Sequence, residues 1–362
     1  MLPKCHSALL LSALACWAPV LALVVVIRPA AVRADDSSPQ RKAVDQAATK
    51  APSAAAEPAL ADYKVTSGVS GSIKSVGSDT MNNLMTLWTE GFKRHYPDVR
   101  AEVEGKGSST APPALIAGTA TFGPMSRDMK ASEIDAFDAK YGYKPVLLPA
   151  AIDMLAVYVH RDNPIQQLSL GQLDAIYSQH RKSGFRRSVR TWGDLGLTDA
   201  WKNRTISAYG RNAASGTYAY FKENALFGGD YRESVIELPG SSSVVQSVAG
   251  DLYAIGYSGI GFATAGVRAV PLAIDTSSKA VPPEPQFALT GDYPLARFLW
   301  IAVNYKPGST LDPLRGEFIK YVFSAAGQSD VVRDGYYPVS ASVAARALAS
   351  VGIRMPDSGA DR

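Results

Sequence analysis

Apolar and polar positions alternate with two different periods along the chain, and their order predicts an α/β fold. Gly71–Val76 alternates residue by residue, which is typical of a strand, and residues 81–96 repeat apolar side chains at helical spacing. Val99–Glu104 predicts a second strand, and Pro112 and Pro113 then open a second helix, where proline is tolerated. By the same criteria we expect strands at residues 146–149, 154–160, 254–259 and 298–303, and helices from residue 132 and at residues 170–178, 218–227, 244–249 and 314–324.

The N-terminal region has the composition of an export signal. Lys4 forms a short basic segment, an apolar run covers residues 8–27, and Val32-Arg33-Ala34 ends the region like a cleavage site. We therefore expect residues 1–34 to be a signal peptide. The apolar run is also long enough to span a bilayer. An uncleaved anchor that tethers the exported protein to the membrane is the alternative.

Residues 35–68 are rich in alanine, proline, serine and charge, so we expect a flexible linker there, and a short tail at residues 355–362. Both cysteines, Cys5 and Cys16, lie in the signal segment, which leaves no disulfide or thiolate in the mature chain. Without the three basic residues of that segment, 34 basic residues face 33 acidic ones, and the net charge falls from +4 to +1. This near-neutral balance gives no support to a nucleic-acid partner.

Three hydroxyl-rich turns fall where a predicted strand leads into a predicted helix. They are Ser78-Asp79-Thr80, Ser108-Ser109-Thr110 and Ser215-Gly216-Thr217. Taken singly, each turn is typical of a helix N-cap. In open α/β sheets, however, ligands bind beyond the carboxyl ends of strands, where such turns converge. Together with Arg127 and Arg211, the hydroxyl and backbone N–H groups predict a cage for a small tetrahedral oxyanion.

The motifs of several common enzyme classes are missing. Gly105-Lys106-Gly107 is not a P-loop, because neither serine nor threonine follows the lysine. Gly256-Tyr257-Ser258-Gly259-Ile260 lacks the last glycine of a nucleophile elbow. His95, His160 and His180 are widely spaced, so we expect no histidine metal cluster. The sequence indicates a binding protein without cofactor or metal, not an enzyme.

Four segments, in order, resemble the phosphate-binding segments of PstS-type proteins, the periplasmic substrate-binding components of ABC phosphate importers. They are Gly77-Ser78-Asp79-Thr80-Met81, Gly107-Ser108-Ser109, Phe122-Gly123-Pro124-Met125-Ser126-Arg127 and Arg211-x-x-x-Ser215-Gly216-Thr217. The resemblance covers about residues 71–270 and extends to Gly335-Tyr336-Tyr337-Pro338. It implies a two-lobed periplasmic-binding-protein fold, type II-like, with a ligand cleft between the lobes.

The resemblance also implies a division of the chain and a function. Residues 69–162 and 252–354 would form lobe I and residues 163–251 lobe II, with the chain crossing near residues 157–163 and 254–262. Lobe closure would bury the anion. We expect a monomeric periplasmic protein that hands inorganic phosphate to an ABC permease of the inner membrane. A binding protein for sulfate or molybdate, a secreted phosphoester hydrolase and an adhesive surface protein are the alternatives.

Carried over by position, the resemblance implies a set of ligand contacts. Two carboxylates of the family pattern are missing, because Ser126 and Ala213 stand at their positions. A buried carboxylate that accepts the proton of hydrogen phosphate rejects sulfate, so we expect Asp79 to accept it, with Asp128 and Asp153 as alternatives. Arg127 either contacts the ligand or supports closure. The implied contacts are Thr80, Met81 through its backbone N–H, Ser108, Ser109, Ser126, Arg127, Arg211, Ser215, Gly216 and Thr217.

Overall fold

The computed structural model describes residues 59–354. The predicted signal peptide (1–34), residues 35–58 of the predicted linker and the predicted tail (355–362) lie outside the described residues. Within residues 59–354, no helix has the length and apolar character needed to cross a membrane.

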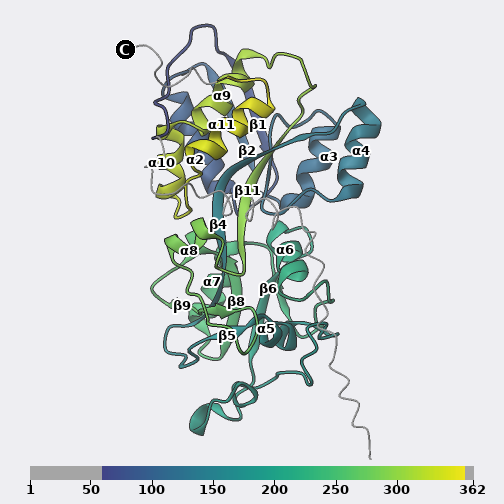
Figure 1. Ribbon diagram of the computed structural model, residues 1–362, viewed down its shortest axis with the longest axis vertical. Helices are drawn as coiled ribbons and strands as arrows, with labels where there is room; N and C mark the ends of the chain where they lie inside the picture. Colours follow the sequence, from purple (N-terminus) through teal and green to yellow (C-terminus); the bar gives the residue numbers. More distant parts are fainter. Residues whose placement is uncertain (1–58, 355–362) are drawn as a thin grey trace, which may run out of the picture. The chain divides into compact units, whose positions relative to one another are not determined.

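Strands and helices alternate through the described chain, so the predicted α/β class is confirmed (Figure 1). The strands are β1 (Gly71–Val76), β2 (Val99–Glu104), β3 (Gly123–Met125), β4 (Val146–His160), β5 (Leu168–Ser169), β6 (Ser207–Arg211), β7 (Ile236–Leu238), β8 (Ala254–Gly259), β9 (Val267–Ala269), β10 (Leu272–Ala273) and β11 (Ala296–Val303). The α-helices are α2 (Asn82–Lys93), α3 (Ala111–Ile116), α4 (Ala131–Tyr141), α5 (Leu170–Tyr177), α6 (Gly216–Asn224), α7 (Ser241–Gly250), α8 (Pro285–Thr290), α9 (Pro313–Val322), α10 (Ala325–Arg333) and α11 (Ala341–Ser350). Short 3-10 helices are η1 (Ser108–Thr110), η2 (Trp192–Leu195), η3 (Asp199–Trp201) and η4 (Ile260–Phe262).

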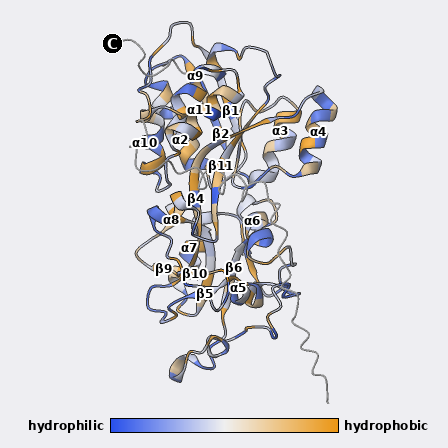
Figure 2. Cartoon of the chain, in the orientation of Figure 1, coloured by the Kyte–Doolittle hydropathy of each residue, from blue (hydrophilic) through white to orange (hydrophobic). Residues whose placement is uncertain are grey.

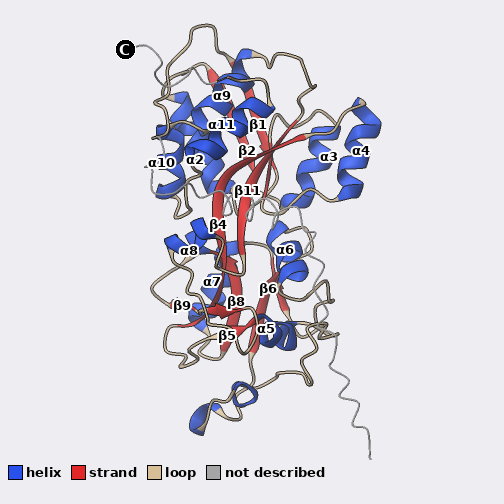
Figure 3. Cartoon of the chain, viewed as in Figure 1, coloured by secondary structure: helices blue, strands red, loops and turns tan. Residues whose placement is uncertain are grey.

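The largest sheet is mixed. Its strands follow the order β3, β11, β4, β8, β6 and β7, with β9 beside the last residues of β4. β4 and β11 lie side by side as an antiparallel pair (Figure 3), whereas β6 is parallel to both β7 and β8. Two parallel pairs, β1 with β2 and β5 with β10, stand apart from this sheet. The large sheet therefore joins early, middle and late parts of the chain.

β4 is a strand of 15 residues, most of them apolar (Figure 2). Such a run is typical of a strand buried on both faces. The sequence predicts two strands here, at residues 146–149 and 154–160, but the structure continues through residues 150–153 as one strand. The register of β11 shifts between Leu299 and Trp300, next to the pair Trp300 and Pro149. Because Pro149 has no backbone N–H to donate, this irregularity lets the long strand continue past it.

Buried apolar residues form two large cores. The first core contains residues 69–151 and 298–351, and the second contains residues 154–295, with a smaller cluster around α7 and β8. The chain therefore passes between the cores within β4 and again at β11. The sequence places these crossings at residues 157–163 and 254–262. The difference arises because residues after β8, among them Val270, Leu272 and Leu295, bury their side chains in the second core.

Residues 59–68, expected to be part of the linker, pack against the first core. Tyr63 lies against Tyr321 with a ring separation of 5.5 Å, and Leu60 also contacts this core. The Tyr63 hydroxyl lies 2.7 Å from that of Tyr96 and donates to Glu317 at 3.0 Å. An aromatic ring with a bonded hydroxyl thus fixes a segment whose overall composition is that of a linker.

Candidate functional site

Each hydroxyl-rich turn follows the carboxyl end of a strand, as the sequence predicts. Ser78-Asp79-Thr80 follows β1, Ser108-Ser109-Thr110 follows β2 and forms η1, and Ser215-Gly216-Thr217 follows β6 and begins α6. The elements around the first two turns pack in the first core, and those around the third pack in the second core. A site formed by all three turns therefore draws on both cores.

Only one of these three turns caps its helix with a side chain. Ser215 Oγ accepts two backbone N–H groups of α6, the nearer from Thr217 at 3.1 Å. Thr80 and Ser108 make no such bond to α2 or η1, so the expectation that they are N-caps is wrong. The hydroxyl groups of Thr80 and Ser108 bond the side chains of Thr217 and Ser126 instead. Because they are not used in capping, they are available to a site between the turns.

Five buried hydroxyl groups, here called the hydroxyl cluster, come together from these turns and from the end of β3. Ser78 Oγ donates to Ser126 Oγ at 3.0 Å, and Ser108 Oγ lies 3.2 Å from Ser126 Oγ. Thr80 Oγ1 lies 3.0 Å from Thr217 Oγ1. This last contact links the turn before α2 to the start of α6, and so links the two cores.

Two glycines allow the backbone to approach the hydroxyl cluster closely. A Cβ on Gly216 would lie 2.2 Å from Ser108 Oγ and 2.5 Å from Ser126 Oγ. Gly107 has a φ of +112°, and a Cβ there would lie 2.5 Å from the carbonyl oxygen of Ala214. Because no side chain fits either position, both glycines are needed for the start of α6 to meet the turn after β2.

Arg211 ends β6 and its side chain is buried. One terminal nitrogen lies 2.5 Å from Asp79 Oδ1 and also donates to the Pro239 carbonyl oxygen, and the other donates to Ser241 Oγ at 2.7 Å. Asp79 Oδ2 in turn accepts the backbone N–H of Ser241, at the start of α7, at 3.1 Å. Among the described residues, Arg211 Nε has no hydrogen-bond partner. These bonds hold the guanidinium in place, and its buried Nε–H remains as a donor without an acceptor among the described residues.

An aromatic layer supports the backbone of Arg211. Its N–H donates to Tyr257 Oη at 3.2 Å, and Tyr257 Oη lies 2.8 Å from Tyr231 Oη. The Tyr257 ring stacks on Phe221 of α6 with centroids 3.9 Å apart. Burial raises the pKa of Tyr257 above its ordinary value, so its phenol is neutral near pH 7. This layer joins the end of β6 to α6 without adding charge.

Arg127 lies beside the hydroxyl cluster but is occupied locally. Its two terminal nitrogens donate to the carboxylate of Glu133, in the first turn of α4, at 2.8 and 2.7 Å. One of them lies 3.5 Å from Ser109 Oγ, and Arg127 Nε has no partner among the described residues. The residue predicted as a second charged ligand is therefore placed to support the turn after β3. Met81, predicted to offer its backbone N–H, is fully buried at the start of α2.

Arg297, which the sequence reasoning missed, also contacts the hydroxyl cluster. It is fully buried, forms an ion pair with Asp153 at 2.7 Å, and donates to Thr217 Oγ1 at 3.1 Å. The predicted strand at residues 298–303 begins one residue too late to include it. A signal did exist, because Arg297 and Asp153 each interrupt an otherwise apolar segment. Buried opposite charges are expected to find each other.

Each of the three arginines near the cluster is paired with a carboxylate. The pairs are Arg211 with Asp79, Arg127 with Glu133, and Arg297 with Asp153. These six groups sum to zero charge, so an anion here would be held by N–H and O–H donors and not by surplus positive charge.

Within the described residues, no group of histidine, cysteine, aspartate and glutamate side chains is arranged to hold a metal ion.

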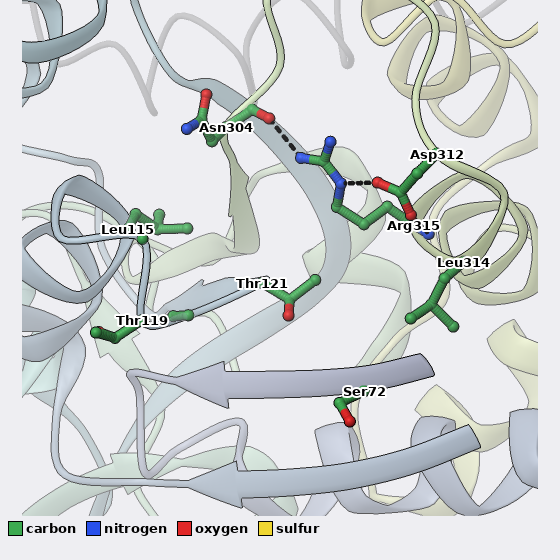
Figure 4. Close-up of a pocket in the computed structure, with 10 residues that line it drawn as sticks. Ser72, Leu115, Thr119, Thr121, Asn304, Asp312, Leu314 and Arg315 are labelled. Atoms are coloured by element: carbon green, nitrogen blue, oxygen red, sulfur yellow. Dashed lines mark hydrogen bonds and ion pairs between the residues drawn. The ribbon is translucent and has the colours of Figure 1, made fainter. Parts of the chain in front are cut away.

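A separate pocket of about 380 Å³ lies beside β1, α3 and α9 (Figure 4). Its cation is Arg315, which bonds Asp312 and donates to the carbonyl oxygen of Asn304 at 2.7 Å. The pocket shares no residue with the hydroxyl cluster and lacks a comparable set of converging hydroxyl groups. It is lined by Ser72, Leu115, Gly118, Thr119, Ala120, Thr121, Asn304, Asp312, Leu314 and Arg315.

Comparison with known proteins gives concordant results. Residues 45–326 match the PBP superfamily domain. The chain is 54% identical over 300 residues to the phosphate-binding protein PstS of Pseudomonas aeruginosa, covering 83% of this chain and 93% of that one. It is 29% identical to the phosphate-binding protein PstS of Bacillus subtilis, covering 75% of this chain and 82% of the relative.

Solved structures agree with the fold. A putative phosphate ABC transporter substrate-binding protein from Clostridium perfringens, crystallised with bound phosphate, superposes with a TM-score of 0.63 at 26% identity. The match covers 75% of this chain and all of that one. An ABC-type phosphate transport receptor from Vibrio cholerae, 24% identical with a TM-score of 0.58, shares the fold over 74% of this chain and all of that one. The predicted periplasmic-binding-protein fold is thereby confirmed.

Proposed function

The chain belongs to the PBP superfamily, and on this premise we propose that it is the substrate-binding component of an ABC importer for inorganic phosphate. The names of its relatives support this assignment, since the Pseudomonas aeruginosa protein is called phosphate-binding and the Clostridium perfringens structure holds phosphate. The protein captures the anion and passes it to a permease unchanged. It is therefore a binding protein and not an enzyme.

Arg211 is the observation that carries the proposal. Its guanidinium is buried and bonds Asp79, which stands between Ser78 and Thr80 in the turn after β1, and its Nε has no partner among the described residues. A buried donor without an acceptor costs about 1–3 kcal/mol, so the site gains when an anion oxygen accepts from it. The bonds to Asp79 and Ser241 hold the guanidinium in this position.

We assign the remaining contacts to the turns. The hydroxyl groups of Thr80, Ser108 and Thr217 donate to the anion together with backbone N–H groups at Met81 and Gly216. Ser109, Ser126 and Ser215 complete the lining or hold it in place, as Ser215 does by capping α6. We assign Arg127 a role behind the turn, because it is paired with Glu133 of its own segment, although its Nε, like that of Arg211, has no partner among the described residues.

Asp79 is the group that we assign to accept the proton of hydrogen phosphate. Its carboxylate accepts three hydrogen bonds in the structure, one from Arg211 and two from Ser241. A carboxylate has about four acceptor positions, so one is left for the ligand. Sulfate, which has no proton at neutral pH, would meet only a negative charge there.

We further propose that the two cores are the lobes of the binding protein, with β4 and β11 as the connecting strands. Lobe I would then contain residues 69–153 and 297–354, and lobe II residues 154–296. We assign two contacts between the cores to a closed arrangement, the bond of Asp79 to Arg211 and the bond from Ser109 N–H to the Ala214 carbonyl oxygen at 3.2 Å. Closing on the anion would form these contacts.

An importer component of this kind works outside the inner membrane. We propose that residues 1–34 direct export to the periplasm, with tethering through the same apolar segment as the alternative. The protein acts as a monomer that docks on its permease. Gel filtration with light scattering of the mature protein measures the first property, and a dimer under these conditions would contradict it.

Calorimetric titration of the mature protein tests the assignment. We expect one phosphate to bind per chain with measurable heat, and the same binding in the presence of excess sulfate. Molybdate titrated under identical conditions serves as a second oxyanion. Absence of phosphate binding would overturn the proposal, and displacement of phosphate by sulfate or molybdate would redirect it to another oxyanion.

A further inference from the structure

Arg297 lies at the boundary between the two cores. Its neighbour Leu295 packs in the second core and Phe298 packs in the first. Its partner Asp153 lies between Ala151 of the first core and Met154 of the second, and the two charged residues face each other in the β4–β11 register. The ion pair thus marks the point where both connecting strands pass from one core to the other.

The guanidinium of Arg297 is almost fully occupied. Nε and one terminal nitrogen donate to Asp153 Oδ2 at 3.0 and 2.7 Å, and the other terminal nitrogen donates to the Ser126 carbonyl oxygen at 2.8 Å. The fourth bond goes to Thr217 Oγ1 at 3.1 Å. Since arginine has five N–H groups, four bonds leave little for direct contact with a ligand. The Arg297 guanidinium also lies 5.2 Å from the centre of the Tyr220 ring.

The bond from Arg297 occupies one acceptor position of the Thr217 hydroxyl group. Arginine only donates, so Thr217 Oγ1 accepts, and the single proton of Thr217 points to another acceptor. Thr80 Oγ1 lies 3.0 Å away, with either hydroxyl able to donate to the other, and an anion oxygen at the hydroxyl cluster would be a better acceptor. A hydroxyl that accepts from a cation is also polarised and becomes a stronger donor.

We propose that Arg297 is a positioning residue of the phosphate site, which acts on the anion through the Thr217 hydroxyl while Asp153 holds it at the strand crossing. This proposal rests on the function proposed above. It assigns a binding role to a charge pair that would otherwise be structural. Arg297 donates to the Thr217 hydroxyl, which in turn donates to the ligand; we call this chain of two hydrogen bonds the relay. Arg211 donates to the ligand directly.

A double-mutant cycle on phosphate affinity tests this relay. The first change is the paired substitution Arg297→Gln with Asp153→Asn, which removes both charges and leaves no buried ion unpaired. The second is Thr217→Val, which keeps the shape of the side chain and removes the hydroxyl. We expect the paired substitution alone to weaken phosphate binding about 10- to 100-fold, the loss expected for a hydrogen bond to a charged group. In the Thr217→Val background it should change affinity by less than about twofold.

Two controls separate this role from a structural one. Thr217→Ser keeps the hydroxyl, so the paired substitution should have its full effect in that background. Arg268→Gln removes another partly buried arginine, whose guanidinium donates to the carbonyl oxygens of Asn163 and Ile165, and it should lower the melting temperature without changing affinity. Melting temperatures of all ligand-free variants are measured in parallel, because a purely structural Arg297 would change these alone.

The outcomes are distinct. Loss of the Arg297 effect in the Thr217→Val background supports the relay. Additive losses of affinity overturn it in favour of independent or direct contact, and an unchanged affinity of the paired variant overturns it as well. If the parent protein binds no phosphate, the proposed function fails and this inference fails with it; if only the coupling is absent, the proposed function stands.

Discussion

Arg211 and Arg297 are both buried and both paired with an aspartate, but the two pairs join different parts of the molecule. Asp79 and Arg211 come from segments of different cores, and the Asp79 side chain is 15% exposed. Asp153 and Arg297 face each other on adjacent strands, and both side chains are 0% exposed. Arg211 retains a buried N–H without a partner among the described residues, whereas every nitrogen of Arg297 donates to the protein.

This difference shows how the same chemical pair can serve two purposes. The Asp79–Arg211 pair joins segments that pack in different cores, so we assign it to the closed arrangement proposed for the site. The Asp153–Arg297 pair lies within the pairing of the adjacent strands β4 and β11, so we assign it to the framework. The segment that supplies the aspartate, more than the burial of the arginine, therefore decides whether we assign an arginine to direct contact with the ligand, as for Arg211, or to the framework behind the site, as for Arg297.

The largest expected effect comes from breaking the framework pair. Asp153→Ala leaves the Arg297 charge buried without its carboxylate, so we expect the free energy of unfolding to fall by about 3–5 kcal/mol. Denaturant unfolding of the ligand-free protein measures this change. A loss below about 1 kcal/mol would show that the pair behaves like an exposed one and would remove the contrast with Asp79–Arg211.

Arg211→Met tests the other side of the comparison. The substitution removes the donor assigned to the anion and keeps an apolar side chain of similar length, so phosphate affinity should fall about 100-fold. Calorimetry measures the affinity, and the melting temperature of the ligand-free protein serves as the control. If the melting temperature falls while affinity is kept, Arg211 belongs to the framework and the comparison is inverted.

Asp79→Asn sharpens the assignment of the proton acceptor. The amide keeps the size of the side chain but removes its negative charge and one acceptor oxygen. We expect the ratio of phosphate affinity to sulfate affinity to fall about 10-fold, the value of one hydrogen bond involving a charged group. Competition titrations with both anions measure the ratio. An unchanged ratio would exclude Asp79 and move the role to Asp128, because Arg297 and the Ile260 N–H already bond the two carboxylate oxygens of Asp153.

The smallest effect on binding is expected at Arg127. Its terminal nitrogens bond Glu133, six residues further on in α4, so Arg127→Met should change phosphate affinity less than about threefold while costing about 1–2 kcal/mol of stability. Glu133→Gln is the matched variant, and it should lower stability similarly. A loss of affinity as large as that of Arg211→Met would restore Arg127 as a direct ligand.

Local features of the site could be predicted from the sequence because they depend on neighbouring residues. Ser215 caps α6 by accepting the backbone N–H groups of Thr217 and Tyr218, two and three residues further along the chain. The turns after β1, β2 and β6 lie where the spacing of apolar residues changes from that of a strand to that of a helix. The assignment of Thr80 and Ser108 as caps failed because their hydroxyl groups bond residues far away in the chain. Thr80 meets Thr217, 137 positions on, and no local pattern shows this contact.

The rest depends on long-range packing. The connecting strands that we propose, β4 and β11, pair residues more than a hundred positions apart, such as Asp153 and Arg297, and no local pattern predicts such a pairing. The sequence predicts two strands at residues 146–149 and 154–160 from their apolar runs, whereas the structure continues as one strand between them. Arg297 escaped notice for the same reason, since its partners Ser126, Asp153 and Thr217 come from three distant segments.

A crystal structure of the mature protein with phosphate tests the central claim most directly. We expect the anion between the turns after β1, β2 and β6, with an oxygen within hydrogen-bonding distance of Arg211 Nε and of the Thr217 hydroxyl, and with Arg297 still bonded to Asp153. Phosphate bound elsewhere, for example beside Arg315, with the hydroxyl cluster empty, would contradict the account.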